Sequence, residues 1–107
     1  MNDEELDLLF KSLADKSRRK MLLALTQNEQ LSVTELGRPL GLSKQLVSKH
    51  LKVLEKAKLV EKAKDGRISR CRFNPQTFQH ITDTLAVYKK FWDARFDALE
   101  EFIKNNS

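Results

Sequence analysis

Residues 43–57 read SKQLVSKHLKVLEKA, and the spacing of their apolar side chains is typical of an amphipathic helix. At about 100° per residue, one side of this helix is lysine, glutamine and serine, with Glu55 at its edge. An ordinary solvated face mixes its charges, because Glu–Lys pairs four residues apart stabilise a helix. This face is instead biased toward hydrogen-bond donors. The other side carries His50 among Leu46, Val47, Leu51, Val53, Leu54 and Ala57.

The positive charge of the chain is concentrated on this helix and on the segment after it. The formal net charge is +5. Residues 43–72 hold ten Lys or Arg against three Asp or Glu, whereas the segments before and after each carry a net charge of −1. A basic block between two nearly neutral ones is typical of a surface that binds a polyanion, although a merely solvated surface would also be basic.

Length and composition favour a single domain over residues 1–107. The first ten residues are acidic where a secretory signal is basic, and no apolar run approaches membrane-spanning length, so no membrane association is expected. The one cysteine, Cys71, cannot form an internal disulfide, which agrees with a reducing compartment. We therefore expect a cytoplasmic protein.

The helix over 43–57 is the second half of a predicted helix-turn-helix at 33–57. Ser32 and Glu35 form an S-x-x-E capping box at the start of the first half, and Ser43 caps the second. Two helices joined by a tight turn at this spacing place the second one in the DNA major groove. The helices expected before 43–57 span residues 3–14, 16–27 and 33–40.

A β-hairpin follows, over residues 59–73. Asp65-Gly66 is a strong signal for a two-residue turn between strands at 59–64 and 67–73. Alternation places Ile68, Arg70 and Arg72 on one face of the second strand, and Ser69, Cys71 and Phe73 on the other. A basic hairpin directly after a helix-turn-helix is a wing, which would contact phosphates through Lys62, Lys64, Arg67, Arg70 and Arg72.

The last helix is expected from Asn74-Pro75 to about residue 104, since Pro is favoured at the first helical position. At 1.5 Å per residue it would be about 45 Å long, too long for its own domain to cover, because a domain of this size has a radius of gyration of about 13 Å. Its apolar stripe predicts a dimer, with the helices at 1–14 and 75–104 at the interface. The expected interface residues are Leu6, Leu9, Phe10, Leu13, Tyr88, Trp92, Arg95, Phe96, Leu99 and Ile103.

These motifs together resemble the ArsR-type winged-helix transcriptional regulators over nearly the whole chain. SLADKSRRKMLLAL (12–25) is similar to the family's second helix, and ELGRPLGLSKQLVSKHLKVLEKAKLV (35–60) to its helix-turn-helix signature. The DGR turn (65–67) and FNP (73–75) match its wing and the start of its last helix. Lys58 stands where the family commonly has Gly, so the end of that helix is expected to be strained or differently capped.

The resemblance implies a mainly α fold, a winged helix-turn-helix of about five helices and a two-stranded hairpin, dimeric through its terminal helices. It also implies a homodimeric repressor on a pseudo-palindromic operator, released by an effector that the sequence does not identify. The FW-x-x-RF-x-x-LE pattern (91–100) resembles a subgroup without an evident metal site.

Side chains in the first half of helix 43–57 are the expected base readers, because lysine and glutamine can bond guanine and adenine edges. They are Lys44, Gln45, Ser48 and Lys49. Ser43, Lys52 and Lys56 are expected at phosphates, together with the wing cations. Arg18, Arg19 and Lys20 fit a backbone contact or an intramolecular ion pair about equally well.

Three further residues have a structural and a functional interpretation. His50 lies in the apolar arc, which favours a core histidine or a phosphate contact over a metal or switch role. Cys71 is on the inward strand face, which favours a packed thiol over a redox sensor. Arg95 points into the apolar sector, where either Asp3, Glu4 or Asp7 of a neighbouring helix would pair with it or its stem would lie along apolar surface.

No metal, cofactor or catalytic activity is expected. The helix at 33–40 has no cysteine or histidine, and the last helix offers only His80 and Asp83, where a zinc site needs a larger ligand set. No nucleophile is paired with a base, and no Gly-rich phosphate loop occurs. The sequence therefore predicts a sequence-specific, double-stranded DNA-binding regulator. The alternatives are a non-specific architectural DNA-binding protein and a protein-interaction module built on the long helix.

Overall fold

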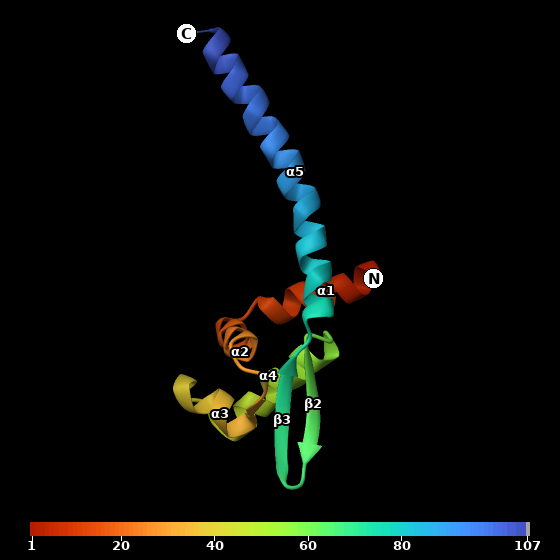
Figure 1. Ribbon diagram of the computed structural model, residues 1–107, viewed down its shortest axis with the longest axis vertical. Helices are drawn as coiled ribbons and strands as arrows, with labels where there is room; N and C mark the ends of the chain where they lie inside the picture. Colours follow the sequence, from red (N-terminus) through yellow and green to blue (C-terminus); the bar gives the residue numbers. More distant parts are fainter. Residues whose placement is uncertain (107) are drawn as a thin grey trace.

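The computed structural model describes residues 1–106 as a small head from which one long helix projects (Figure 1). The head is mainly helical, with a short antiparallel sheet at one side, as predicted. In chain order the elements are α1 (Asp3–Leu13), α2 (Lys16–Thr26), β1 (Leu31–Ser32), α3 (Val33–Gly37), the 3-10 helix η1 (Arg38–Leu40), α4 (Lys44–Lys56), β2 (Val60–Asp65), β3 (Ile68–Phe73) and α5 (Pro75–Asn105).

Local sequence explains where the helices begin. Every α-helix of the described chain starts after a side chain that accepts a hydrogen bond from the first turn, which satisfies N–H groups that have no partner within the helix. The capping box of Ser32 and Glu35 is present in both directions, as predicted. The five capping residues are Asn2, Asp15, Ser32, Ser43 and Asn74.

The predicted helix over 33–40 is in fact two elements. The α-helix ends at Gly37, and residues Arg38–Leu40 form one 3-10 turn with Pro39 near its start. Proline has no N–H to continue the α-helical pattern. Gly41 ends the turn with a φ of +65°, a left-handed conformation that glycine adopts without steric cost.

The wing is the predicted hairpin with one addition. β2 and β3 pair in the antiparallel sense from Val60↔Phe73 to Asp65↔Ile68, and Gly66 in the turn has a φ of +63°. The two-residue strand β1, which the sequence did not predict, pairs with the other edge of β3 through Leu31↔Cys71. Two residues are too short to show the alternation by which a strand is recognised.

The core lies between α1, α2, α4 and the base of the sheet. Its fully buried members include Leu9, Met21, Val47, Leu51 and Cys71. Cys71 therefore faces inward, as the strand alternation predicted. Leu46 and Val53 of α4 are 39% and 36% exposed, so the buried side of that helix is narrower than its apolar side.

Only the first turns of α5 contact the head, where Thr77 and Ile81 are buried. Every large apolar side chain from Leu85 to Ile103 is at least 49% exposed. The radius of gyration is 18.6 Å and the longest extent is 67 Å, against the about 13 Å radius of gyration of a compact domain of this size. Within residues 1–106, none of the helices combines the length and the apolar character that crossing a membrane requires.

Candidate nucleic-acid interface

The helix-turn-helix is held together by a close contact between α3 and α4. A Cβ atom added at Gly37 would lie 2.6 Å from Cγ2 of Val47 and 3.1 Å from the carbonyl oxygen of Leu42. Val47, Leu51 and Leu54 bury one side of α4 in the core. The opposite side of α4 is consequently turned outward.

The structure places the predicted base readers on this outward side. Lys44, Gln45 and Lys49 are exposed, and Ser48 is half-buried. Lys52 and Lys56, predicted at phosphates, are also exposed on α4. The Ser43 hydroxyl accepts a hydrogen bond from the backbone N–H of Leu46 at 3.2 Å, so this residue caps the helix in addition to any contact with a phosphate.

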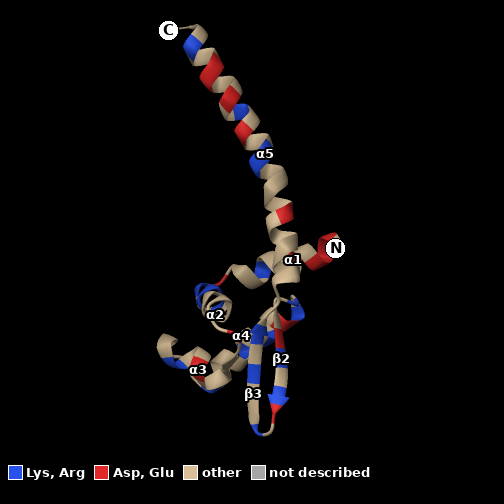
Figure 2. Ribbon diagram, in the orientation of Figure 1, with Lys and Arg blue, Asp and Glu red and all other residues tan. Residues whose placement is uncertain are grey.

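The wing cations divide between two faces. Lys62 and Lys64 line a hollow between the wing and α4, together with Ser69 and Glu55. These two lysines therefore lie beside α4. Figure 2 shows Lys and Arg positions gathered on α4 and the wing. Arg67 lies at the exposed tip of the hairpin.

The other face of the wing pairs its arginines internally. Arg70 Nε lies 3.6 Å from Asp65 Oδ2, and Arg72 Nη2 lies 3.7 Å from Glu61 Oε2. Arg70 Nε is buried and makes no hydrogen bond, so its pairing with Asp65 is electrostatic only. The Arg70 side chain is 31% exposed and that of Arg72 is 60% exposed, so the phosphate contact predicted for Arg72 stays a prediction.

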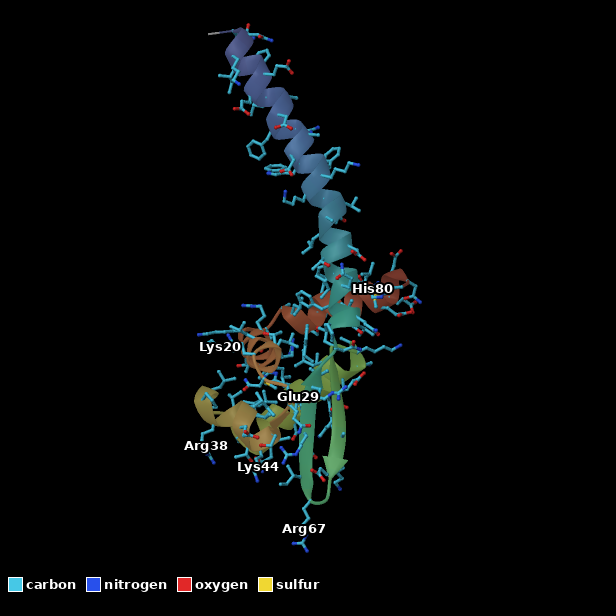
Figure 3. All side chains as sticks on the ribbon, in the orientation of Figure 1. Lys20, Glu29, Arg38, Lys44, Arg67 and His80 are labelled. Atoms are coloured by element: carbon cyan, nitrogen blue, oxygen red, sulfur yellow. The ribbon has the colours of Figure 1, made fainter. Side chains whose placement is uncertain are left out.

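Arg38 belongs to the same surface and was missed by sequence reasoning. It is exposed on η1 and lines a groove between α3 and α4 with Thr34 and Lys44. Figure 3 places Arg38, Lys44 and Arg67 at the end of the head away from α5, with Lys20 closer to α5. The sequence held a signal for Arg38, because it is the only Lys or Arg between Lys20 and Lys44 and it lies within the predicted helix-turn-helix.

Arg18 and Arg19 are used inside the protein. Arg18 Nε and Nη2 donate to the carbonyls of Ser12 and Lys11 at 2.7 and 3.1 Å, and Arg19 Nη1 donates to that of Leu13 at 2.8 Å. These carbonyls end α1, where a helix leaves acceptors without partners. Both arginines therefore make intramolecular hydrogen bonds to carbonyls, and not the ion pair that the sequence suggested.

His50 faces α2 and not the outward side of α4. Its side chain is 14% exposed, and Nδ1 lies 3.9 Å from Asp15 Oδ2 and 3.4 Å from Arg18 Nη1. The hydrogen bond from the backbone N–H of Arg18, followed by the charges of His50 and Arg18, holds the pKa of Asp15 below its usual range. This mostly buried position agrees with the interpretation of His50 as a core histidine.

The remaining candidate ligands do not converge. Burial raises the pKa of the Cys71 thiol, which keeps it in the unreactive protonated form. His80 and Asp83 are exposed on α5, and Asp83 accepts a hydrogen bond from Gln79 Nε2 at 2.9 Å. Among residues 1–106, His, Cys, Asp and Glu side chains nowhere form a group of three or more that would hold a metal ion.

Three of the predicted interface residues differ in their exposure and contacts. Leu9 was predicted at the dimer interface, but its side chain is fully buried within the head of the single chain. It has no exposed surface for a second chain to cover, so this prediction is wrong. Phe10, on the same helix, is 39% exposed. On α5, Arg95 lies over the ring of Phe91 with 5.6 Å between the guanidinium carbon and the ring centroid. The Arg95 stem therefore runs along an apolar surface, with its charge on an aromatic face.

The head, its outward donor helix and its basic hairpin define a winged helix-turn-helix protein of the DNA-binding class. A family model described as a helix-turn-helix domain matches residues 13–63. The HTH-type transcriptional regulator YuzN of Bacillus subtilis (strain 168) is 32% identical over 81 residues, covering 70% of this chain and 88% of that protein. The arsenical resistance operon repressor of Escherichia coli (strain K12) is 29% identical over 98 residues, covering 91% and 80%.

Comparison with solved structures gives the same class of protein. An ArsR-like transcriptional regulator from Rhodococcus sp. RHA1 superposes with a TM-score of 0.77 at 30% identity, over 95% of this chain and 93% of that one. The chain belongs to the ArsR-type family of winged helix-turn-helix transcriptional regulators. It is a DNA-binding transcriptional regulator, and its family is one of regulators and not of enzymes.

Proposed function

We propose that this protein is a repressor that binds a pseudo-palindromic operator as a homodimer, in the compartment that holds the DNA, the cytoplasm. The observation that carries the proposal is the outward side of α4, a row of exposed donors continuous with cations on either flank. Recognition helices related by a two-fold axis enter successive major grooves about one helical turn apart. In a promoter, such a complex obstructs transcription.

The position of each side chain on this surface decides whether we assign it to base edges or to phosphates. Lys44, Gln45, Ser48 and Lys49 lie on the N-terminal half of α4, the part of a recognition helix that contacts base edges. Lys52 and Lys56 lie further along the helix and are assigned to phosphates. Arg38, Lys62, Lys64 and Arg67 flank the helix on both sides, where the backbone strands run beside an occupied groove.

A dimer is proposed because α5 exposes more apolar surface than one chain can cover. Tyr88, Trp92, Phe96, Leu99 and Ile103 are between 49% and 69% exposed. A contiguous apolar surface of this kind marks an interaction site on a protein that is otherwise polar outside. A second copy is the simplest occupant, since the family resemblance implies a homodimer and an operator of matching symmetry.

The test is selection of bound duplexes from a random pool, followed by affinity measurements on the most enriched sequence and on a scrambled one. Specific binders typically favour their site by about 10³–10⁷ over non-specific DNA. Gln45→Ala is expected to relax base preference at one position of each half-site, with a loss of about 1–3 kcal/mol in discrimination. The salt dependence of binding should barely change for this variant.

The matched phosphate variant is Lys64→Ala. It should weaken binding to both duplexes alike and flatten the log–log dependence on salt by about 0.9 for each lost phosphate contact. Equal affinity of the unmodified protein for all duplexes would instead show an architectural DNA-binding protein. Binding that does not change with salt would show that the basic surface does not contact phosphates. It would favour a protein-interaction module built on α5.

A further inference from the structure

One guanidinium lies where α1, α2 and α4 meet. Arg18, in the first turn of α2, donates from Nε to the carbonyl of Ser12 at 2.7 Å and from Nη2 to that of Lys11 at 3.1 Å. Its third nitrogen, Nη1, is 3.4 Å from Nδ1 of His50 on α4. A single side chain thus contacts the end of one helix and the buried flank of the recognition helix.

The chemistry of these contacts makes them directional. A guanidinium carries five donors in a rigid planar fork and accepts nothing. When His50 is neutral with its proton on Nε2, Nδ1 can accept a hydrogen bond from Arg18 Nη1. Asp15 lies beside this contact, since its carboxylate accepts the Arg18 backbone N–H at 2.9 Å and its Oδ2 lies 3.9 Å from His50 Nδ1.

We propose that Arg18 is a positioning residue, which sets the orientation of α4 relative to α1 by bridging the α1 carbonyls to His50. His50 directly follows Lys49 on the recognition helix, so a displacement at His50 moves the side chains assigned to bases. The inference rests on the proposed function, in which α4 reads DNA, and on the expectation from the sequence that α1 lies at the dimer interface. In the proposed dimer, Arg18 would then make the orientation of each α4 depend on the position of the α1 in the same chain.

Arg19 supplies a matched control. It donates to the carbonyl of Leu13 at 2.8 Å, the next carbonyl at the same end of α1. In residues 1–106 it has no hydrogen bond or ion pair to α4. Arg19→Ala therefore removes a comparable cap of α1 and leaves the bridge to the recognition helix intact.

The experiment measures a specificity ratio, the dissociation constant for a scrambled duplex divided by that for the duplex most enriched by the unmodified protein. Arg18→Ala is expected to lower this ratio by about fivefold or more, as a coupling between two elements of this kind does. Arg19→Ala should leave the ratio unchanged, although urea unfolding detects the loss of a cap in both variants. Equal ratios for the two variants would overturn the proposal.

Substitutions at His50 test the bridge without touching the caps of α1. His50→Ala should lower the ratio as Arg18→Ala does, whereas His50→Gln keeps an acceptor and should retain it. The double variant Arg18→Ala/His50→Ala should be no worse than either single variant, because both remove the same contact. Additive losses would show two independent effects and contradict the bridge.

The two proposals fail in different ways. If the unmodified protein enriches no duplex, the proposed function fails and the role of Arg18 fails with it. If it enriches a duplex and Arg18→Ala keeps the full ratio, DNA reading stands and only the positioning role is wrong.

Discussion

Lys58 follows α4 with a φ of +63°, a left-handed conformation that costs a residue with a Cβ about 1–2 kcal/mol. The hydrogen bonds around it explain why the chain accepts this conformation. Leu59 N donates to the Leu54 carbonyl at 3.0 Å and Lys58 N to that of Glu55 at 2.9 Å, which together form a Schellman helix end. The family commonly has glycine here, so the strain foreseen at this helix end is present.

Lys58→Gly is accordingly expected to stabilise the protein. Relief of the left-handed strain exceeds the entropy that glycine adds to the unfolded chain, for a net gain of about 0.5–1 kcal/mol. Lys58→Ala is the control, because it removes the same charge and keeps the Cβ, and should give no gain. The free energy of unfolding in urea measures both, and equal effects of the two variants would show that φ is not the cause.

Asp15 carries a pH-dependent part of the stability. Its pKa is lowered in the folded protein, first by the hydrogen bond from the Arg18 backbone N–H and then by neighbouring positive charge. A carboxyl whose folded pKa is depressed contributes stability above its unfolded value, about pH 4, and loses it as the pH falls through the folded value.

Asp15→Asn keeps a good capping residue and removes the titration. We expect urea unfolding of this variant to lose less stability between pH 7 and pH 3 than the unmodified protein loses. Glu35 keeps its own lowered pKa in both proteins, so part of the acid sensitivity remains. Identical losses in the two proteins would contradict the role given to Asp15.

Between elements, the helix-turn-helix depends on how closely α3 approaches α4. Gly37 is buried at this contact, and its φ and ψ are ordinary helical values of −82° and −32°. Its requirement for glycine is therefore one of space and not of backbone conformation. Any side chain here pushes on Val47, in the middle of the buried side of the recognition helix.

Gly37→Ala should destabilise the protein by about 1–3 kcal/mol, as overpacking of a filled core does. Alanine's higher helix propensity offsets up to about 1 kcal/mol of this cost. Adding Val47→Ala removes the methyl group that lies 2.6 Å from the new Cβ, so the double variant should lose less stability than the sum of the two single ones. Additive losses in urea unfolding would show that the clash is relieved elsewhere.

At the scale of the whole molecule, α5 is longer than its head. Its 31 residues extend past every other element, and its aromatic rings pack on one another, with Trp92 and Phe96 edge to face at 4.9 Å between centroids. Charged side chains lie on the opposite side, where Lys89 bonds Asp93 at 2.8 Å. The polar side of α5 thus faces solvent, with Lys89 and Asp93 paired on the helix, whereas its apolar side beyond the head is covered by no other element of residues 1–106.

Leu99→Glu should weaken the proposed dimer by about tenfold or more, because the carboxylate would be buried in an apolar interface without a partner. The head should keep its stability, since Leu99 is 53% exposed and lies beyond it. Ala86→Glu adds the same charge on the polar side of α5 and should leave association unchanged. Sedimentation equilibrium measures both, and a monomeric unmodified protein would remove the basis of the dimer.

The sequence by itself determined the elements, because caps, glycine turns and apolar spacing act over four residues or fewer. The capping box, the Asp65-Gly66 turn and the reach of α5 follow from such patterns. The strain at Lys58 was expected from the family resemblance, since the family commonly has glycine there. The exposed row on α4 follows as well, since a helix with one apolar side turns the other outward. Tertiary structure alone decided which elements meet and at what register. It joined Arg18 to His50 and added β1 to the edge of β3, because these contacts link residues that are far apart in the sequence and meet only when the head packs.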